Sequence, residues 1–316
     1  MIIANPIYDT VFKYLMEDIE IAKGVLSVII NTEITELHVK SQETTSEIAV
    51  ANKIPINIYR LDFVAVVKQA DGTYRKALIE LQKTKRSTNI SRFRRYLGEN
   101  YQKEDAVTEN GVEMARPLEI ITIYFLGFEL DDVPVSVLKV KNCFVDATTG
   151  SLLNPEPKNQ FIRLLNHESY TIQIPKLQPN DKSRLEKVLN IFSQKYKTTD
   201  IHILNYQGKT DDPLIKRIIN RLTRAIADES LRRQMNVEDE IESELQELSQ
   251  KLEEKDKKLE EKDKKLEEKD KKLEEKDKKL EEKDKKLEEK EKKLEEKEKE
   301  NTELLRQLEE LRKQIK

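Results

Sequence analysis

The sequence predicts an α/β domain followed by a long charged C-terminal helix. Up to about residue 235 helical and strand periodicities alternate, whereas from Ile241 onward apolar residues recur at heptad spacing in a highly charged background. Residues 236–316 contain 25 Lys/Arg and 31 Asp/Glu. Residues 1–235 contain 33 Lys/Arg and 30 Asp/Glu. The first part is therefore mildly basic, which neither requires nor excludes nucleic acid, because phosphate binding depends on local clusters of charge.

The N-terminal part begins with a predicted helix and continues into a predicted hairpin. Residues 6–30 carry apolar side chains at helical spacing, and residues 47–51 predict a short strand. Residues 58–67 and 73–82 predict two strands, because each is rich in β-branched and apolar residues. Ala70-Asp71-Gly72 lies between them and predicts a tight turn.

This hairpin brings two carboxylates together. A three-residue loop pairs Gln69 with Thr73, and counting back along the strands sets Asp62 opposite Glu80. Gln82 points to the same face as Glu80, because side chains alternate along a strand. Carboxylates in apolar strands are costly to bury unless something pairs with them, and a divalent metal ion is the natural partner.

The elements after the hairpin alternate between helix and strand. Residues 90–103 predict a helix capped within Ser87-Thr88-Asn89, and residues 118–127 predict a strand. Further elements are predicted from residue 133 onward: strands at 133–140 and 142–145, a turn at 147–150, a helix capped by Asp181 with Leu185, Val188, Leu189 and Phe192 facing inward, and a helix from Pro213 with Ile215, Ile218, Ile219, Leu222 and Ile226 on its apolar face.

Several motifs occur in order within about residues 5–130. They are Asp9-Thr10-Val11-Phe12-Lys13, Asp62, Glu80-Leu81-Gln82, Arg92-Phe93-Arg94-Arg95-Tyr96, and the apolar strand near residue 120. Together they resemble the PD-(D/E)XK nuclease superfamily, and more narrowly its branch of recombination-promoting nucleases and nuclease-family transposases. In that branch a glutamine replaces the lysine of the motif, as Gln82 does here.

The resemblance implies a restriction-endonuclease-like core, in which helices flank a mixed sheet. Residues 1–130 would form this core, residues 131–235 an α+β extension of it, and residues 236–316 a coiled coil or single charged helix. The implied activity is Mg²⁺-dependent (or Mn²⁺-dependent) cleavage of DNA, in transposition, recombination or defence. A catalytically inactive nuclease fold that binds DNA or serves as a scaffold is the alternative.

The expected metal site combines three residues of the hairpin. Asp62 and Glu80 offer hard oxygen ligands suited to Mg²⁺ or Mn²⁺, and the resemblance adds the backbone carbonyl of Leu81. Gln82 can orient a water molecule by hydrogen bonding, but it carries no charge and cannot act as a base. On the alternative interpretation, Asp62 and Glu80 are ordinary cross-strand residues on the surface of an amphipathic hairpin.

The other expected site residues are cations and one further carboxylate. Lys13 lies one helical turn from Asp9 and is the better candidate for the positive charge that the motif lacks. Asp9 fits metal binding or a favourable position at a helix N-terminus equally well. Arg92, Arg95 and Lys83 are expected to contact DNA, although a solvated helix face explains the two arginines about as well.

Other classes of protein fit the sequence poorly. The single cysteine, Cys143, allows no intramolecular disulfide, and the three histidines lack the spacing of metal ligands. The N-terminus lacks the features of a signal peptide, and no apolar run approaches ~18 residues. We therefore expect a protein of the reducing cytoplasm that does not enter a membrane.

The C-terminal repeat predicts a rod. Leucines from Leu252 to Leu294 recur every seven residues and fall at heptad position a, whereas lysines from Lys255 to Lys297 occupy position d. Asn301 at an a position favours two strands, and Lys258 at g faces Asp263 at e of a parallel partner. Glutamate–lysine pairs four residues apart also stabilise a lone helix. A parallel homodimer is therefore expected, and a solitary charged helix is the alternative.

Overall fold

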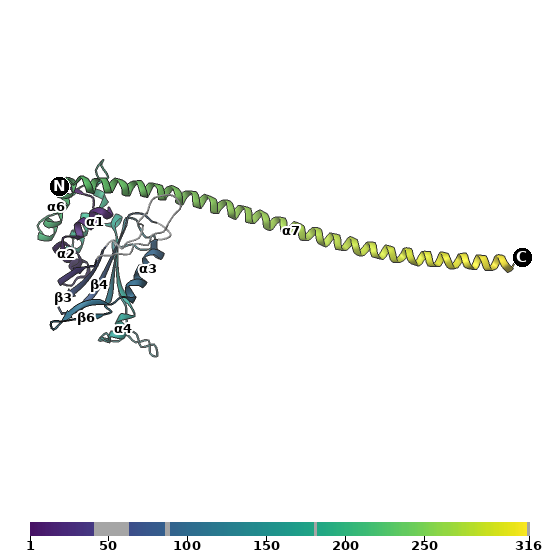
Figure 1. The fold of residues 1–316 in the computed structure, drawn as a ribbon, viewed down its shortest axis with the longest axis horizontal. Helices are drawn as coiled ribbons and strands as arrows, with labels where there is room; N and C mark the ends of the chain where they lie inside the picture. The colour runs from purple at the N-terminus through teal and green to yellow at the C-terminus, as the bar shows by residue number, and fades with distance from the viewer. Residues whose placement is uncertain (41–62, 86–88, 180–181, 315–316) are drawn as a thin grey trace. The chain divides into compact units, whose positions relative to one another are not determined.

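The computed structural model describes residues 1–40, 63–85, 89–179 and 182–314 (Figure 1). The chain divides into two compact units, Met1–Glu240 and Ile241–Lys316. The first unit is an α/β fold whose largest sheet has six strands among the described residues, and the second consists of a long helix. The prediction of an α/β fold followed by a long charged C-terminal helix is confirmed.

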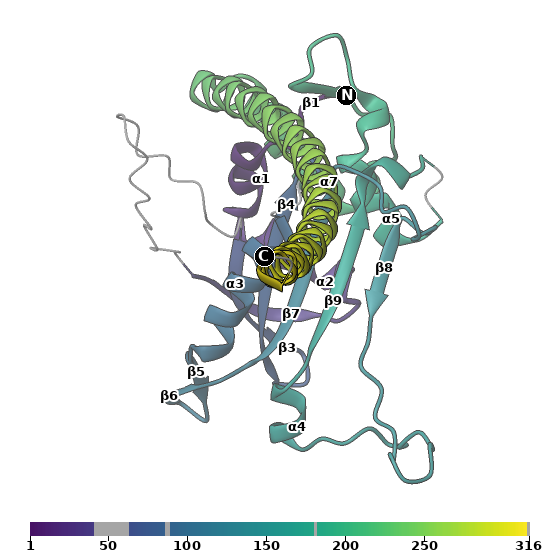
Figure 2. The ribbon, with the colours of Figure 1, turned by 90° about the vertical axis from the view of Figure 1, so that its right-hand side faces the viewer.

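The large sheet is mixed. Its strand order is β2-β3-β4-β7-β9-β8, and β4, β7 and β9 lie side by side as parallel neighbours (Figure 2). The pairs β2/β3, β3/β4 and β8/β9 are antiparallel. The strands span Ile34–Val39 (β2), Phe63–Gln69 (β3), Tyr74–Gln82 (β4), Glu119–Leu126 (β7), Val137–Val140 (β8) and His167–Gln173 (β9).

The β3–β4 hairpin has the predicted register over its described residues. The backbone N–H of Gln69 donates to the carbonyl of Thr73 at 2.8 Å, and Phe63 pairs with Ile79. Gly72 has a φ of 85°, a conformation that glycine adopts without steric cost. Asp62 and the predicted strand at 47–51 lie outside the described residues.

The first predicted helix is two helices, so the expectation of one helix over residues 6–30 is wrong. Helix α1 spans Asp9–Met16 and α2 spans Ile19–Ile30. The Asp18 carboxylate accepts the backbone N–H groups of Glu20 and Ile21 at 3.1 and 3.2 Å and thereby begins α2. Such a cap is worth about 1 kcal/mol, which favours a new helix over continuation of the first.

Helices cover both faces of the sheet. On one face α1 and α2 pack with α5 and α6 over strand residues such as Ala65, Ile79 and Ile123. On the other face Phe93 and Tyr96 of α3 pack on Val64 and Leu78. The even-numbered positions of β4 therefore face α3. Helix α3 spans Asn89–Gln102, α5 spans Arg184–Leu189, α6 spans Pro213–Ile226 and α7 spans Glu229–Gln314.

Two small sheets were not predicted. Strands β5 and β6, Asp105–Glu109 and Val112–Arg116, form a hairpin through Asn110 and Gly111, whose φ angles are 52° and 79°. Asn-Gly is the usual sequence of such a turn. Strand β1, Ile2–Ala4, pairs with β10, Ile203–Asn205.

Several expectations beyond residue 130 are corrected. Only Val137–Val140 of the predicted strand 133–140 is a strand, and residues 142–145 contribute just a bridge from Val145 to Leu152. Strand β9 was missed. Asp181 lies outside the described residues, and Ser183 caps α5 with Glu186 as its capping-box partner. The short helices span Gln160–Leu164 (α4), Ile174–Lys176 (η1), Asn190–Phe192 (η2) and Gln194–Tyr196 (η3).

The predicted inward faces of α5 and α6 are mostly confirmed. Helix α6 begins at Pro213, and the Asp212 carboxylate accepts the N–H of Leu214 at 2.8 Å. The residues that are buried as predicted are Val188, Leu189, Phe192, Ile215, Ile218, Ile219 and Leu222, whereas Leu185 and Ile226 are partly buried.

Helix α7 begins in the first unit and continues through the heptad repeat. Leu231 and Met235 are buried in the main core, whereas the repeat leucines from Leu252 to Leu294 are 56–63% exposed. Along the described part of the repeat, these leucines therefore form an exposed apolar stripe. No helix in the described ranges combines the length and the apolar character needed to cross a bilayer.

Candidate functional site

Glu80 is a buried carboxylate near the carboxyl end of β4. Its side chain faces α3, and the residue is 0% exposed. The Arg92 guanidinium of α3 donates a hydrogen bond to Oε1, whereas the buried Oε2 has no hydrogen-bond partner among the described residues. Burial raises the pKa of Glu80 above its ordinary value, although the Arg92 charge and hydrogen bond lower it. Glu80 thus has one buried oxygen without a hydrogen-bond partner among the described residues, and Arg92 compensates its negative charge only in part.

Two charged side chains of α1 act on Glu80 electrostatically. After burial and Arg92, the charges of Asp9 and Lys13 also act on the pKa of Glu80, Asp9 raising it and Lys13 lowering it. Lys13 Nζ contacts Asp9 Oδ2 at 2.5 Å, and the buried Asp9 Oδ1 accepts no hydrogen bond from the described part of the chain. The charges of Asp9 and Lys13 thus act on Glu80, which lies in a separate motif of the sequence.

Leu81 and Gln82 are the last two residues of β4. Gln82 is 8% exposed and occupies the same face of β4 as Glu80. Its backbone carbonyl accepts the N–H of Gly127 at 2.7 Å. A Cβ atom on Gly127 would lie 2.2 Å from the Lys83 carbonyl oxygen, so glycine allows this close approach of the two chain segments. The Leu81 side chain belongs to the core on the opposite face.

Tyr124 also lines the site, although the sequence did not single it out. It lies beside Glu80 in the parallel register of β4 and β7, and its ring centroid is 4.3 Å from that of Phe93. Burial raises the pKa of the Tyr124 hydroxyl, and the nearby Glu80 charge raises it further. The signal that could have found it is the parallel pairing of the two predicted strands.

The predicted DNA-contacting residues lie in different surroundings. Arg92 is turned toward Glu80, and its side chain is 27% exposed. Arg95 lies one helical turn further along α3 and is exposed, as is Arg94. A guanidinium at the site and two on the adjoining surface of α3 are compatible with contacts to a phosphate backbone, which stay a prediction.

Lys83 contacts helix α7. Its Nζ lies 2.5 Å from Asp239 Oδ1 and 3.8 Å from the centroid of the Tyr8 ring. The Tyr8 hydroxyl donates to both oxygens of Asp239 at 3.0 Å, and His202 Nε2 lies 2.7 Å from Oδ2. Burial raises the pKa of Asp239, but hydrogen bonds from Lys83 and His202 outweigh it and bring the pKa below the usual value.

Glu238, the residue before Asp239, binds the start of α1. Its two carboxylate oxygens accept the backbone N–H groups of Asp9 at 3.0 Å and Thr10 at 2.8 Å. Burial raises the pKa of Glu238 to about 7, although the Thr10 N–H group opposes the rise. A groove of about 650 Å³, lined by residues of both helices, runs between α1 and this part of α7.

The residues present suit a hard divalent cation only in part. The described chain contains no cluster of three or more His, Cys, Asp or Glu side chains that could hold a metal ion. Glu80 does supply a buried carboxylate oxygen without a hydrogen-bond partner in that part of the chain, which is the type of ligand that Mg²⁺ prefers. The second carboxylate expected at the site is that of Asp62, which is outside the described residues.

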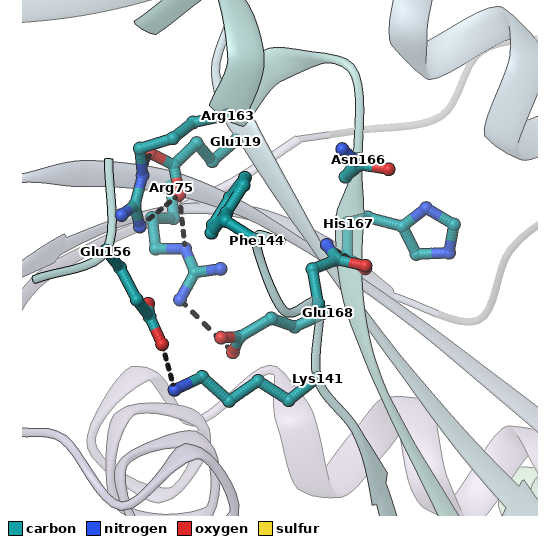
Figure 3. A pocket seen from close by; sticks show the side chains of 10 residues that line it. Arg75, Glu119, Lys141, Phe144, Glu156, Arg163, Asn166, His167 and Glu168 are labelled. Carbon is teal, nitrogen blue, oxygen red and sulfur yellow. Dashed lines mark hydrogen bonds and ion pairs between the residues drawn. The ribbon is translucent and has the colours of Figure 1, made fainter. Parts of the chain in front are cut away.

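A second charged cluster lies at the amino ends of the same strands (Figure 3). Arg75 of β4 lies between Glu119 and Glu168, with N–O distances of 3.7 and 3.6 Å. Arg163 binds Glu119 with two hydrogen bonds of 2.6 and 3.0 Å. The pocket between these side chains is only about 40 Å³, and its acids and bases neutralise one another.

Comparison with protein-family models, curated proteins and solved structures finds no match to this chain. The likeness to PD-(D/E)XK nucleases therefore rests on the motifs around Glu80 and on the order of the surrounding elements. Function has to be inferred from what these side chains can do chemically.

Proposed function

We propose that this protein is a Mg²⁺-dependent DNA endonuclease with a PD-(D/E)XK-type core. The observation that carries the proposal is the buried Glu80 carboxylate, which retains an oxygen without a hydrogen-bond partner among the described residues. Two features support it. Ligands of α/β sheets commonly bind at the carboxyl ends of parallel strands, where Glu80 and Gln82 lie. The order α1–α2, β2, β3, β4, α3, β7, with the β5–β6 hairpin between α3 and β7, is compatible with the helix, three strands, helix, strand order of the nuclease core.

Mg²⁺ would be held by Asp62 and Glu80, with the Leu81 carbonyl as a further ligand. When bound, the ion supplies charge stabilisation for the phosphate and lowers the pKa of a water molecule. The pKa of Glu80, raised by burial, fits this role because a cation restores the ionised form.

Gln82 and the neighbouring cations have separate roles. The Gln82 amide orients the attacking water by hydrogen bonding. The Arg92 guanidinium and Lys13 ammonium supply the positive charge that the glutamine-containing motif lacks, and both already act on the pKa of Glu80. The exposed Arg95 extends this positive region along α3 toward a DNA backbone.

The direct test is cleavage of supercoiled plasmid DNA in the presence of Mg²⁺. Wild-type protein should nick or linearise the plasmid, and Asp62→Ala should be inactive while retaining the wild-type circular dichroism spectrum. Loss of cleavage when EDTA is added, with recovery on addition of Mg²⁺ or Mn²⁺, is expected. Equal cleavage by wild type and Asp62→Ala would mean that a contaminating nuclease or another site is responsible.

A catalytically inactive nuclease fold is the second candidate, and the ion pair between Arg92 and Glu80 favours it. Arg92 occupies one oxygen of the only carboxylate that the described residues supply on this part of β4. In an inactive protein this pair would be permanent, and the exposed arginines of α3 would serve DNA binding alone. Salt-sensitive DNA binding without cleavage, unaffected by Asp62→Ala, would support this candidate.

We propose further that the heptad repeat of α7 forms a parallel homodimer. The leucine stripe is 56–63% exposed in the single chain, and pairing would bury it. Parallel pairing sets lysines at g against aspartates at e, whereas antiparallel pairing would set lysine against lysine and aspartate against aspartate. Lysines at d weaken the seam, so we expect a weak, salt-sensitive dimer.

Sedimentation tests the dimer. Full-length protein at tens of micromolar should be dimeric at low salt and should dissociate as salt rises. A chain that ends at Glu240 should be monomeric and folded, because the first compact unit ends there. A monomeric full-length protein at low salt would instead favour the solitary helix, a spacer of about 1.5 Å per residue. The reducing cytoplasm and a role in transposition, recombination or defence belong to the same proposal.

A further inference from the structure

The first turns of α7 contact both segments that carry the candidate site. Glu238 binds the backbone of Asp9 and Thr10 at the start of α1, and Asp239 binds Lys83, which directly follows Gln82. These contacts join residues separated by more than 150 positions in the sequence. Their convergence on α1 and β4 links the base of the long helix to the residues around Glu80.

Glu238 caps α1 from another helix. The first N–H groups of any helix lack partners within that helix and need an acceptor from elsewhere. Tyr8, the residue at the N-cap position of α1, makes no side-chain capping hydrogen bond. Glu238 accepts two of these N–H groups instead, and Thr10 Oγ1 also hydrogen-bonds to Gln234. The position of Asp9, and of Lys13 one turn later, therefore depends on α7.

Asp239 fixes the other side of the site. It accepts hydrogen bonds from Lys83 and from Tyr8, the residues next to Gln82 and Asp9 respectively. His202 Nε2 also lies 2.7 Å from Oδ2 of this carboxylate. The Asp239 side chain of α7 thus connects the end of β4 to the start of α1. The contact with His202 restricts the movement of the Asp239 carboxylate.

We propose that Glu238 and Asp239 are positioning residues for the candidate site. They act through the start of α1, which carries Asp9 and Lys13, and through Lys83, which follows Gln82 at the end of β4. This inference rests on the proposed nuclease function for its catalytic consequence. Misplacement of catalytic groups by about 1 Å can cost ~10²-fold in rate, so loosening either contact should slow cleavage without weakening DNA binding.

Amide hydrogen exchange of the full-length protein tests the structural part of the proposal at pH 8, where Glu238 is mostly ionised. Glu238→Ala should speed exchange in residues 9–13 at least tenfold, and Glu238→Gln should largely restore protection because its amide oxygen still accepts hydrogen bonds. Glu240→Ala is the matched control, because Glu240 is an exposed neighbour on the same helix. Unchanged exchange in Glu238→Ala would overturn the proposal.

Steady-state cleavage by the same variants tests the catalytic part. In Glu238→Ala and Asp239→Asn, kcat should fall about 10- to 100-fold with KM for DNA within about twofold of wild type. Glu238→Gln and Glu240→Ala should retain most of the activity. If Glu238→Ala fails to fold, Asp239→Asn carries the test. Increased exchange with unchanged kcat would show that the contacts are merely structural and would overturn the proposal.

Failure of the proposed function is distinguishable from failure of this inference. A wild-type protein that does not cleave plasmid DNA under any Mg²⁺ or Mn²⁺ condition overturns the nuclease assignment and the catalytic part of the inference with it. The exchange measurement still decides whether Glu238 holds the start of α1. Active wild type combined with unaltered exchange and kcat in both variants overturns the inference alone.

Discussion

At the amino end of β4, Arg75 lies between Glu119 and Glu168, and Arg163 binds Glu119 with two hydrogen bonds. At the carboxyl end of the same strand, Glu80 is completely buried and has Arg92 on one oxygen only. Both ends carry charged side chains on a shared sheet. The amino end is balanced, whereas the carboxyl end keeps an acid whose ionisation the fold opposes.

The difference indicates where a ligand would bind. Ion pairs of balanced charge leave little for a further cation to gain. A buried carboxylate with a raised pKa is costly to the fold, and proteins tend to keep such groups where function requires them. The sheet architecture alone does not determine which end binds a ligand, because strands β4, β7 and β9 contribute to both ends. If the two ends differ in function as they do in charge balance, variants at each end should behave differently.

The largest difference should appear in activity. Glu80→Gln removes a metal ligand while preserving shape, so cleavage of plasmid DNA should fall about 10³-fold, or ~4 kcal/mol in activation free energy. Glu168→Gln at the other end should remain within about twofold of wild type. A comparable loss in both variants would erase the distinction between the two ends, because the effect would then reflect general stability.

The second largest effect concerns Gln82. If its amide orients the attacking water, Gln82→Ala should slow cleavage about 10- to 100-fold and leave Mn²⁺ affinity nearly unchanged. Gln82→Lys would match the Lys-containing motif of PD-(D/E)XK nucleases, and on the proposed function it should retain activity. Kinetics and calorimetry on the two variants measure these effects. Full activity in Gln82→Ala would place the residue outside the site.

Stability should also separate the two ends. Arg92→Ala leaves the buried Glu80 without its cation and should cost about 2–4 kcal/mol, whereas Arg163→Ala breaks a more exposed pair and should cost about 1 kcal/mol. Millimolar Mg²⁺ should recover much of the loss in Arg92→Ala, because the ion replaces the missing charge. Urea denaturation with and without Mg²⁺ measures this. Equal recovery in the two variants, or none in either, would contradict a metal site at Glu80.

The smallest effect is a pH dependence at Glu238. Its pKa is raised to about 7, mainly by burial, so the folded protein holds this proton more tightly than the unfolded chain does. The associated stability is present below about pH 4.5 and is lost as pH rises through about 7. Glu238→Gln removes this loss. The melting temperature of the variant relative to wild type should therefore rise between pH 5 and pH 8. A difference independent of pH would contradict the raised pKa.

The fold was predictable where local patterns dominate. Strand alternation and the Ala70-Asp71-Gly72 turn predicted the β3–β4 hairpin with its register, and Pro213 marked the start of α6. Strand β9 was missed because its segment, His167–Gln173, is largely polar, and it becomes a strand by pairing with β7 and β8. The split between α1 and α2 turns on the single cap at Asp18, which sits within an otherwise continuous helical pattern.

The candidate site was predictable where it depends on local motifs and not where it depends on contacts between distant parts of the chain. The motifs set Glu80 and Gln82 on one face of β4 and also named Asp9 and Lys13, whose charges act on the pKa of Glu80. The contacts of Glu238 and Asp239 could not be read from the sequence. Both residues look like ordinary acids at the start of a charged helix, and their partners lie far away in the chain. Arg92 likewise appeared to face DNA, and only tertiary packing turns it toward Glu80.

The central claim is that the carboxyl end of β4 binds a divalent metal ion through Glu80 and Asp62. Isothermal titration calorimetry with Mn²⁺ tests it most directly. The wild-type protein should bind the ion weakly at one site, and the Asp62→Asn/Glu80→Gln double variant should lose that binding. The Glu119→Gln/Glu168→Gln variant, altered at the amino end, should keep it. Unchanged Mn²⁺ affinity in the Asp62/Glu80 double variant would contradict the account.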